Sequence, residues 1–294
     1  MAWSRRPAVS AAADGSVLPM PASTLTVRGI EVPKLGFGTW QVTGDDGREA
    51  VRDALQLGYR HIDTARVYAN EVQVGEGLRE SGVPREEVWL TSKIWPDAAR
   101  ERDLRRSVEQ QLSDLGVDRL DLLLLHWPAP DVPLSETIAA LGDLREEGLI
   151  REFGVSNFPS AMLREAAALG PVFANQVEYH AYLAQEAVLA ACHESSVMLT
   201  AYSPFAHGRL LDDTVLADVA AAHDATPGQV ALAWLLDQEL VSAIPKASSH
   251  ERRAENLAAL ELQLTSEEHD RIGALRSRNL RTANPGGLAP AWDR

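Results

Sequence analysis

Cysteine is almost absent from this 294-residue sequence. Cys192 is the single cysteine, and no Cys/His spacing is typical of a zinc site. One thiol cannot form an intrachain disulfide, so a disulfide-stapled fold is excluded, and the usage favours a reducing, cytoplasmic environment. The sequence contains no run of about 18 apolar residues, the length that a membrane-spanning helix requires. The Arg5-Arg6 pair is not followed by a sustained apolar stretch, so we expect no secretory or twin-arginine signal.

Positive charge is also scarce. The chain has 28 lysines and arginines against 42 acidic residues, a net charge of −14. A negative field repels nucleic acids and anionic membranes, so we expect a small-molecule substrate and no nucleic-acid, membrane or obligate protein partner. Lysine itself occurs only at Lys34, Lys93 and Lys246. The other positively charged side chains are all arginine. A position that keeps lysine in such a sequence indicates a need for a compact ammonium whose pKa can be tuned. Lys34 is expected at the surface.

The hydrophobic pattern predicts a single-domain α/β protein. Residues 1–23 lack periodicity and are interpreted as a flexible tail. Two β-prone runs flank Arg28-Gly29 and predict a hairpin. Eight short apolar runs then alternate with amphipathic stretches such as residues 102–115. These runs are LGFG, YRHID, VWLTS, LDLLLL, EFGVS, ANQVEY, VMLTAY and VSAI.

Alternation of strand and helix favours a (β/α)8 TIM barrel over residues 24–280. The expected hairpin caps the bottom of the barrel, and residues 281–294 form a C-terminal loop that can fold over its mouth. The long interval from Tyr202 to Lys246 predicts an inserted helix or functional loop.

Ionisable residues follow three successive predicted strands. Asp63, Lys93 and His126 stand at strand ends, and Tyr68 lies five residues after Asp63. Strand ends share one mouth in a barrel, so these side chains are expected to meet there. Taken singly, each residue also has a structural interpretation, such as a helix cap for Asp63 or a structural ion pair for Lys93.

The chemistry of such a cluster is that of a proton donor. We expect the ammonium of Lys93 to lower the pKa of the Tyr68 phenol, while Asp63 holds the ammonium and a neutral His126 orients a carbonyl oxygen. Motifs typical of other enzyme classes are absent from the sequence. Gly75–Glu80 lacks the third glycine of a Rossmann fingerprint, and no GK[ST], HExxH or GxSxG motif is present.

The string GYRHIDTARVYANEVQVG, residues 58–75, resembles the first signature of the aldo-keto reductases. The resemblance continues through LTSKIW, LLLLHWP, GVSNF, NQVEYH, AYSPF and IPKASSHERRAEN, over about residues 25–280. It implies NADPH-dependent carbonyl reduction on a barrel, with Tyr68 as general acid, Asp63 and Lys93 as its tuning pair, and His126 orienting the substrate.

The resemblance also implies how the cofactor is held. Ser156, Asn157 and Gln176 would hydrogen-bond the nicotinamide carboxamide, and Tyr202 would stack against the ring. Asn157 and Gln176 could instead tie neighbouring strands together. The resemblance implies that Lys246, Arg252, Glu255 and Asn256 grip the adenosine 2′-phosphate. Ala247 departs from the Ser or Thr usual in this motif, so either Ser248 substitutes for it or the affinity for the phosphate is weaker. The pyrophosphate is expected near residues 203–210, where the sequence leads to a helix N-terminus. The full implied cofactor set is Thr39, Asp63, Ser156, Asn157, Gln176, Tyr202, Ser203, Phe205, Lys246, Ser248, Arg252, Glu255 and Asn256.

Aromatic residues after strand ends predict an apolar substrate pocket. Trp40, Trp95 and Trp127 join Tyr68 and His126 in this expected pocket, and the C-terminal loop would add Trp292. Trp127 could instead pack under a loop. The short C-terminal loop resembles the bacterial branch that includes the 2,5-diketogluconate reductases, and the family resemblance favours a monomer.

Two other functions remain open at this stage. A lysine at the mouth of a barrel can act as a Schiff-base nucleophile, which would make Lys93 the centre of a lyase. The same fold also serves as a cofactor-binding regulatory subunit with little turnover, as in the potassium-channel β subunits.

Overall fold

The computed structural model describes residues 23–293, so the predicted tail lies almost wholly outside the described residues. An antiparallel hairpin opens this part of the chain, formed by β1 (Thr24–Val27) and β2 (Ile30–Pro33) around Arg28-Gly29, as predicted. Eight parallel strands follow: β3 (Phe37–Gly38), β4 (His61–Asp63), β5 (Trp89–Ile94), β6 (Leu120–Leu125), β7 (Ile150–Ser156), β8 (Ala174–Glu178), β9 (Met198–Tyr202) and β10 (Val241–Ala243).

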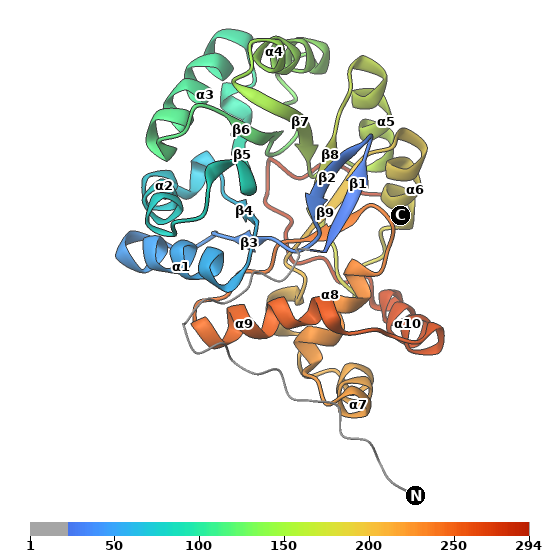
Figure 1. Ribbon diagram of the computed structural model, residues 1–294. Coiled ribbons are helices and arrows are strands. Elements are labelled where there is room, and N and C mark those ends of the chain that lie inside the picture. Colours follow the sequence, from blue (N-terminus) through green and yellow to red (C-terminus); the bar gives the residue numbers. More distant parts are fainter. Residues whose placement is uncertain (1–22, 294) are drawn as a thin grey trace, which may run out of the picture.

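The eight strands lie side by side in chain order, and the two edges of the sheet meet. The Gly36 amide donates to the Ala243 carbonyl at 2.8 Å, and the Gly38 amide donates to Pro245 at 3.1 Å. Each strand therefore follows its neighbour around a ring, as in a (β/α)8 fold (Figure 1). Among the described residues no helix is long and apolar enough to cross a membrane.

Helices surround this ring (Figure 1). They are α1 (Gly44–Leu57), α2 (Glu71–Glu80), α3 (Glu101–Leu115), α4 (Leu134–Glu146), α5 (Ser160–Leu169), α6 (Glu186–Ser195), α7 (Thr214–His223), α8 (Pro227–Leu236), α9 (His250–Ala258) and α10 (Ser266–Gly273). The long interval before Lys246 holds two helices, α7 and α8, which confirms the predicted insertion.

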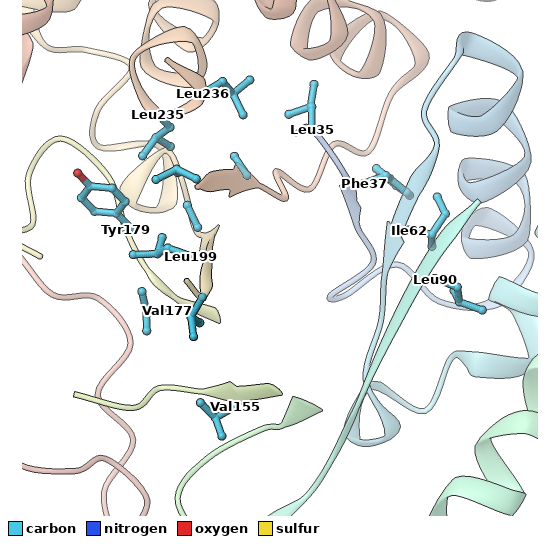
Figure 2. Close-up of a cluster of buried hydrophobic side chains, with 14 of the residues drawn as sticks. Leu35, Phe37, Ile62, Leu90, Val155, Val177, Tyr179, Leu199, Leu235 and Leu236 are labelled. Atoms are coloured by element: carbon cyan, nitrogen blue, oxygen red, sulfur yellow. The ribbon is translucent and has the colours of Figure 1, made fainter. Parts of the chain in front are cut away.

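Strand β6 shows why its sequence is continuously apolar. Leu123 and Leu125 belong to the large core between strands and helices, whereas Leu122 and Leu124 belong to a second cluster together with Leu25 of the hairpin. Alternate side chains of a strand point to opposite faces, so both faces of β6 are buried. Figure 2 shows other members of the large core, including Ile62, Leu90, Val177 and Leu199, around the ring of strands.

Helix α3 follows its predicted periodicity. Leu104, Val108, Leu112 and Leu115 are all buried, and the helix ends at Gly116, whose φ of 66° suits glycine. The C-terminal end of α3 meets α2 closely, because a Cβ on Gly75 would stand 2.1 Å from the Leu115 carbonyl oxygen. The glycine that closes the aldo-keto-reductase-like signature therefore serves helix packing.

Two residues noted in the sequence have distinct environments. Lys34, expected at the surface, is half-buried, and its Nζ donates to the Leu236 carbonyl at 2.8 Å. A lysine there satisfies a carbonyl that the end of α8 leaves without an intrahelical partner. Cys192 on α6 is 1% exposed, and burial raises the pKa of its thiol to about 12.

Candidate active site

An ion pair inside the ring of strands forms the base of the site. Lys93 on β5 is fully buried, and its Nζ donates to Asp63 Oδ1 on the adjacent strand β4 at 2.5 Å. The same Nζ donates to the Thr64 carbonyl at 2.7 Å, and Gln176 Nε2, on β8, donates to Asp63 Oδ2 at 2.7 Å. Burial lowers the pKa of Lys93, and the Asp63 carboxylate opposes that effect.

Tyr68 lies over this pair, at the end of a 3-10 turn formed by Arg66–Tyr68. Lys93 Nζ is 5.3 Å from the centroid of the Tyr68 ring, and the His126 ring lies 5.8 Å from it, edge to face. The predicted direction of the phenol pKa is wrong: burial raises it, and the charge of Asp63 raises it further. Asp63 offsets the ammonium that was expected to lower the pKa, so Tyr68 carries its proton throughout the physiological range.

His126 immediately follows β6 and is held neutral. Burial, followed by the nearby charge of Lys93, lowers its pKa well below 6.5. Its Nδ1 is buried without a hydrogen-bond partner among the described residues, and the Trp95 ring packs edge-on at 5.3 Å. A neutral imidazole beside a phenol can donate a hydrogen bond to a carbonyl oxygen.

A second set of polar side chains crosses from β7 to β9. Asn157, in a left-handed conformation (φ 63°), donates from Nδ2 to the His126 carbonyl at 3.0 Å and accepts from the Tyr202 hydroxyl at 2.8 Å. The Ser156 hydroxyl donates to the Gln176 carbonyl at 2.8 Å, so Ser156 joins β7 to β8 and does not reach the cleft. This arrangement keeps Asn157 and Tyr202 fixed with respect to His126.

Most of these residues line a cleft of about 840 Å³, whereas Lys93 and Ser156 are not among its lining residues. Trp40, Trp95 and Trp127 line it and give it aromatic walls. The other sequence-predicted residues on its surface are Thr39, Asp63, Tyr68, His126, Asn157, Gln176, Tyr202, Ser203, Phe205 and Lys246. Val67, His207, Ala283 and Pro285, which sequence reasoning did not name, also line it. His207 lies in residues 203–210, and Ala283 and Pro285 lie in the C-terminal loop, the two segments expected near the mouth; Val67 could have been found from its place beside Tyr68 in the signature.

The expected phosphate-binding residues are only partly assembled at the cleft. Lys246 lines it and is exposed, and Ser248 and Arg252 are exposed nearby in sequence. Glu255 instead accepts from the Thr226 hydroxyl at 2.6 Å, and Asn256 is buried on α9. These two residues are engaged in packing α9 against its surroundings.

The loop after β9 departs from its expected form. Residues 203–210 hold a short 3-10 turn, Ala206–Gly208, and helix α7 begins only at Thr214. The Asp213 side chain already accepts from the Val215 amide at 2.8 Å. A carboxylate therefore caps this helix, and its N-terminus is not a ready anion site.

The C-terminal segment passes beside the cleft and is fixed at two points. Glu178, at the end of β8, accepts from the amides of Thr282 and Ala283 at 2.8 Å each. Asp293 accepts from the amide and the hydroxyl of Ser160 at 2.8 Å each. Between these points, the Trp292 ring lies 6.3 Å from that of Trp127. Trp292 therefore packs against Trp127 but is not among the residues that line the cleft.

Replacement of Glu178 by glutamine is expected to weaken this attachment in a pH-dependent way. Burial alone would raise the pKa of Glu178, but hydrogen bonds from His180, Thr282 and Ala283 lower it from 4.5 to about 2. A lowered pKa contributes stability that is complete above about pH 4.5 and is lost as the pH falls toward 2. In thermal unfolding, Glu178→Gln should therefore melt below the wild type at neutral pH, with the difference shrinking as the solution is acidified.

A surface carboxylate offers a control for this experiment. Glu194 makes an exposed ion pair with Arg164, so Glu194→Gln should change the melting temperature little at any pH. A constant difference between Glu178→Gln and wild type across the acid range would contradict the assignment.

Comparison with known proteins agrees with this fold and site. Residues 34–277 match the model of the aldo/keto reductase family. The methylglyoxal reductase DkgB of Escherichia coli O157:H7 is 42% identical over 267 residues, covering 89% of this chain and 99% of that protein. A crystal structure described as a 2,5-diketo-D-gluconic acid reductase B aligns with a TM-score of 0.90 and 42% identity, covering 92% of this chain and 97% of that chain.

An aldo-keto reductase of Bombyx mori, AKR2E4, solved in complex with NADP, aligns with a TM-score of 0.84 and 32% identity, covering 90% and 96% of the two chains. The chain belongs to the aldo/keto reductase family. It is an oxidoreductase that reduces carbonyl groups with a nicotinamide cofactor.

Proposed function

We propose that this protein reduces small aldehydes and ketones to alcohols with NADPH, using Tyr68 as the general acid. The observation that carries the proposal is the buried Asp63–Lys93 pair beneath Tyr68 and His126, at the floor of an aromatic-walled cleft. Groups of this kind supply a proton and a hydrogen bond to the oxygen of a carbonyl.

The cleft has the donor set that a nicotinamide dinucleotide requires. Asn157 and Gln176 present amide groups at its floor, Tyr202 presents a ring, and Thr39 has a buried Oγ1 without a partner among the described residues. We propose that these residues hold the nicotinamide end and that Lys246 binds the 2′-phosphate. When bound, the reduced cofactor supplies a hydride to the carbonyl carbon.

The residues of this chain account for the rest of the reaction. Neutral His126 donates a hydrogen bond to the carbonyl oxygen and orients it toward Tyr68. The phenol keeps its proton until negative charge develops on that oxygen, and then transfers it to form the alcohol. Lys93, held by Asp63, stabilises the phenolate that remains.

The rival functions find less support in the same geometry. Lys93 is fully buried, lies outside the cleft lining, and donates to both Asp63 and Thr64, so its nitrogen is poorly placed to attack a carbonyl. A regulatory role would need no proton donor in the cleft. We therefore favour catalysis over a lyase or a cofactor-sensing subunit.

An assay across carbonyl compounds tests the proposal. Consumption of NADPH is followed by its absorbance with methylglyoxal, an aromatic aldehyde, an α-keto ester, a diketone and a keto sugar as separate substrates. We expect turnover with at least one small carbonyl, because the aromatic walls present mainly apolar surface to the substrate. Binding of NADPH with negligible turnover of every compound would favour the regulatory role.

Replacement of Lys246 by alanine is expected to weaken NADPH more than NADH. The exposed ammonium of Lys246 can pair with the 2′-phosphate that distinguishes the two cofactors. A charge-assisted contact of this kind contributes about 1.5–3 kcal/mol, so KM for NADPH should rise roughly 10- to 160-fold.

In the same variant, KM for NADH should rise only slightly. Lys34→Ala serves as a control for the general loss of one positive charge. Lys34 donates to the Leu236 carbonyl and is not among the residues that line the cleft. Equal weakening of NADPH and NADH by Lys246→Ala would contradict the phosphate role.

We also propose that the β1–β2 hairpin closes the barrel at the amino ends of the strands. Leu25, Val27 and Val32 pack with Trp89 and Met198, the first residues of β5 and β9. Residues 24–280 would then form one domain, with residues 281–293 as the C-terminal loop beside the cleft. The cytoplasmic location, the monomeric state and the absence of an obligate protein partner are retained as expectations from composition and resemblance.

A further inference from the structure

A buried carboxylate close to Tyr68 has no part in the chemistry proposed above. Glu71 is the first residue of α2, is 2% exposed, and is not part of the cleft lining. Removing a carboxylate from water is costly unless hydrogen bonds or an ion pair compensate it. The partners of Glu71 therefore indicate what it holds in place.

Glu71 connects the turn that carries Tyr68 to the strand that carries Lys93. Ser92 Oγ, on β5, donates to Glu71 Oε1 at 2.7 Å, and Ser92 precedes Lys93 in the chain. Arg66 Nη1 donates to Glu71 Oε2 at 3.1 Å, and Arg66 begins the 3-10 turn that ends at Tyr68. Both oxygens of one carboxylate are thus used to fix the turn against β5.

The neighbouring residue Asn70 attaches the same turn on its other side. Asn70 is fully buried, and its Nδ2 donates to the carbonyls of Thr39 at 2.9 Å and Val42 at 2.8 Å. Its Oδ1 accepts from the Thr64 hydroxyl at 2.9 Å, and the Thr64 carbonyl accepts from Lys93. The loops on both sides of Tyr68 are therefore tied to one another and to Lys93.

Backbone strain at Ala69 shows that the turn is held and not relaxed. Ala69, between Tyr68 and Asn70, has φ 53°, a left-handed conformation that is unfavourable for alanine. Such a conformation persists where surrounding contacts over-determine the backbone. Asn70 and Glu71 supply those contacts on the C-terminal side of the strained residue.

The geometry points to Glu71 as a positioning residue that sets the Tyr68 hydroxyl relative to Lys93 and His126. This inference rests on the proposed role of Tyr68 as general acid. Because Glu71 does not line the cleft, it acts through Tyr68 and leaves cofactor binding unaffected.

Glu71→Gln is the first variant of the test. Glutamine has the same size but only one acceptor oxygen, whereas Glu71 uses two. Misplacement of a catalytic group by about 1 Å can cost up to about 100-fold, so kcat should fall roughly 10- to 100-fold. The Kd for NADPH, measured by tryptophan fluorescence, should stay unchanged.

Glu152→Gln is the matched control. Glu152, on β7, pairs with Arg145 at 3.3 Å, and its side chain is 6% exposed against 2% for Glu71. The partner arginines are similarly exposed, at 41% and 39%. The two variants should lower the melting temperature comparably, but Glu152→Gln should keep kcat. Equal kcat losses in both variants would overturn the inference.

The decisive measurement combines Glu71→Gln with Tyr68→Phe, using methylglyoxal at high concentration to detect the residual rate. If Glu71 acts through the Tyr68 hydroxyl, the double variant should be no slower than Tyr68→Phe alone. A further loss equal to that of Glu71→Gln in the wild type would refute the inference. Full turnover by Tyr68→Phe would refute the proposed function itself. Should Glu71→Gln fail to fold, Ser92→Ala removes one donor to Glu71 and enters the same comparison.

Discussion

Replacing Tyr68 by phenylalanine should lower kcat by roughly 10²- to 10⁴-fold, the range that general acid catalysis contributes. The ring that carries this hydroxyl packs against both Lys93 and His126 and lines the cleft. The substitution removes one oxygen atom and leaves the ring in contact with His126, so the cleft should keep its shape. Titration with NADPH should give an unchanged Kd.

A second buried tyrosine provides the control. The Tyr179 hydroxyl donates to Gln238 at 2.8 Å, and Tyr179 is not part of the cleft lining. Tyr179→Phe should lower stability slightly and leave turnover intact. Near-normal turnover by Tyr68→Phe would mean that another group protonates the product.

The Asp63–Lys93 pair should contribute to stability and to catalysis in separable ways. Asp63→Asn leaves the ammonium of Lys93 buried without a counter-charge. Lys93→Met likewise leaves the carboxylate of Asp63 buried without a counter-charge. Breaking a buried pair from one side costs about 3–5 kcal/mol of unfolding free energy. Each single variant should therefore unfold at a lower denaturant concentration and lose most of its turnover.

The double variant Asp63→Asn/Lys93→Met separates the two effects. It carries no unpaired buried charge, so it should regain much of the lost unfolding free energy, because neutral replacements of a buried ion pair are often tolerated. Turnover should stay low, because no cation remains to stabilise the Tyr68 phenolate. Recovery of both stability and turnover would show that the pair is structural only. Chemical denaturation and steady-state kinetics on the three variants decide the matter.

The strands and helices were predictable because their signals are local. The apolar run of β6 and the spacing of Leu104, Val108, Leu112 and Leu115 in α3 each follow from one short segment. The resemblance to the aldo-keto reductases is confirmed by the family match. The proximity of Asp63, Lys93, Tyr68 and His126 followed from the rule that parallel strands end at one edge.

The features that escaped prediction depend on contacts between distant segments. The raised pKa of Tyr68 results from burial, which a sequence does not display, and from the nearby negative charge of Asp63. The half-burial of Lys34 depends on the end of α8, about 200 residues further along the chain. The attachment of Thr282 to Glu178 likewise joins residues far apart in sequence. The individual roles assigned to the cofactor-binding residues stay predictions.

The burial of Cys192 has a practical consequence for spectroscopy. Maleimide and alkylating dyes react with thiolates, and this thiol is both shielded and held protonated by its raised pKa. Because the sequence has no other cysteine, one introduced on the C-terminal segment near Ala283 would carry a fluorophore alone in the folded protein. The wild-type chain is therefore a ready background for single-site labelling of movements at the rim of the cleft.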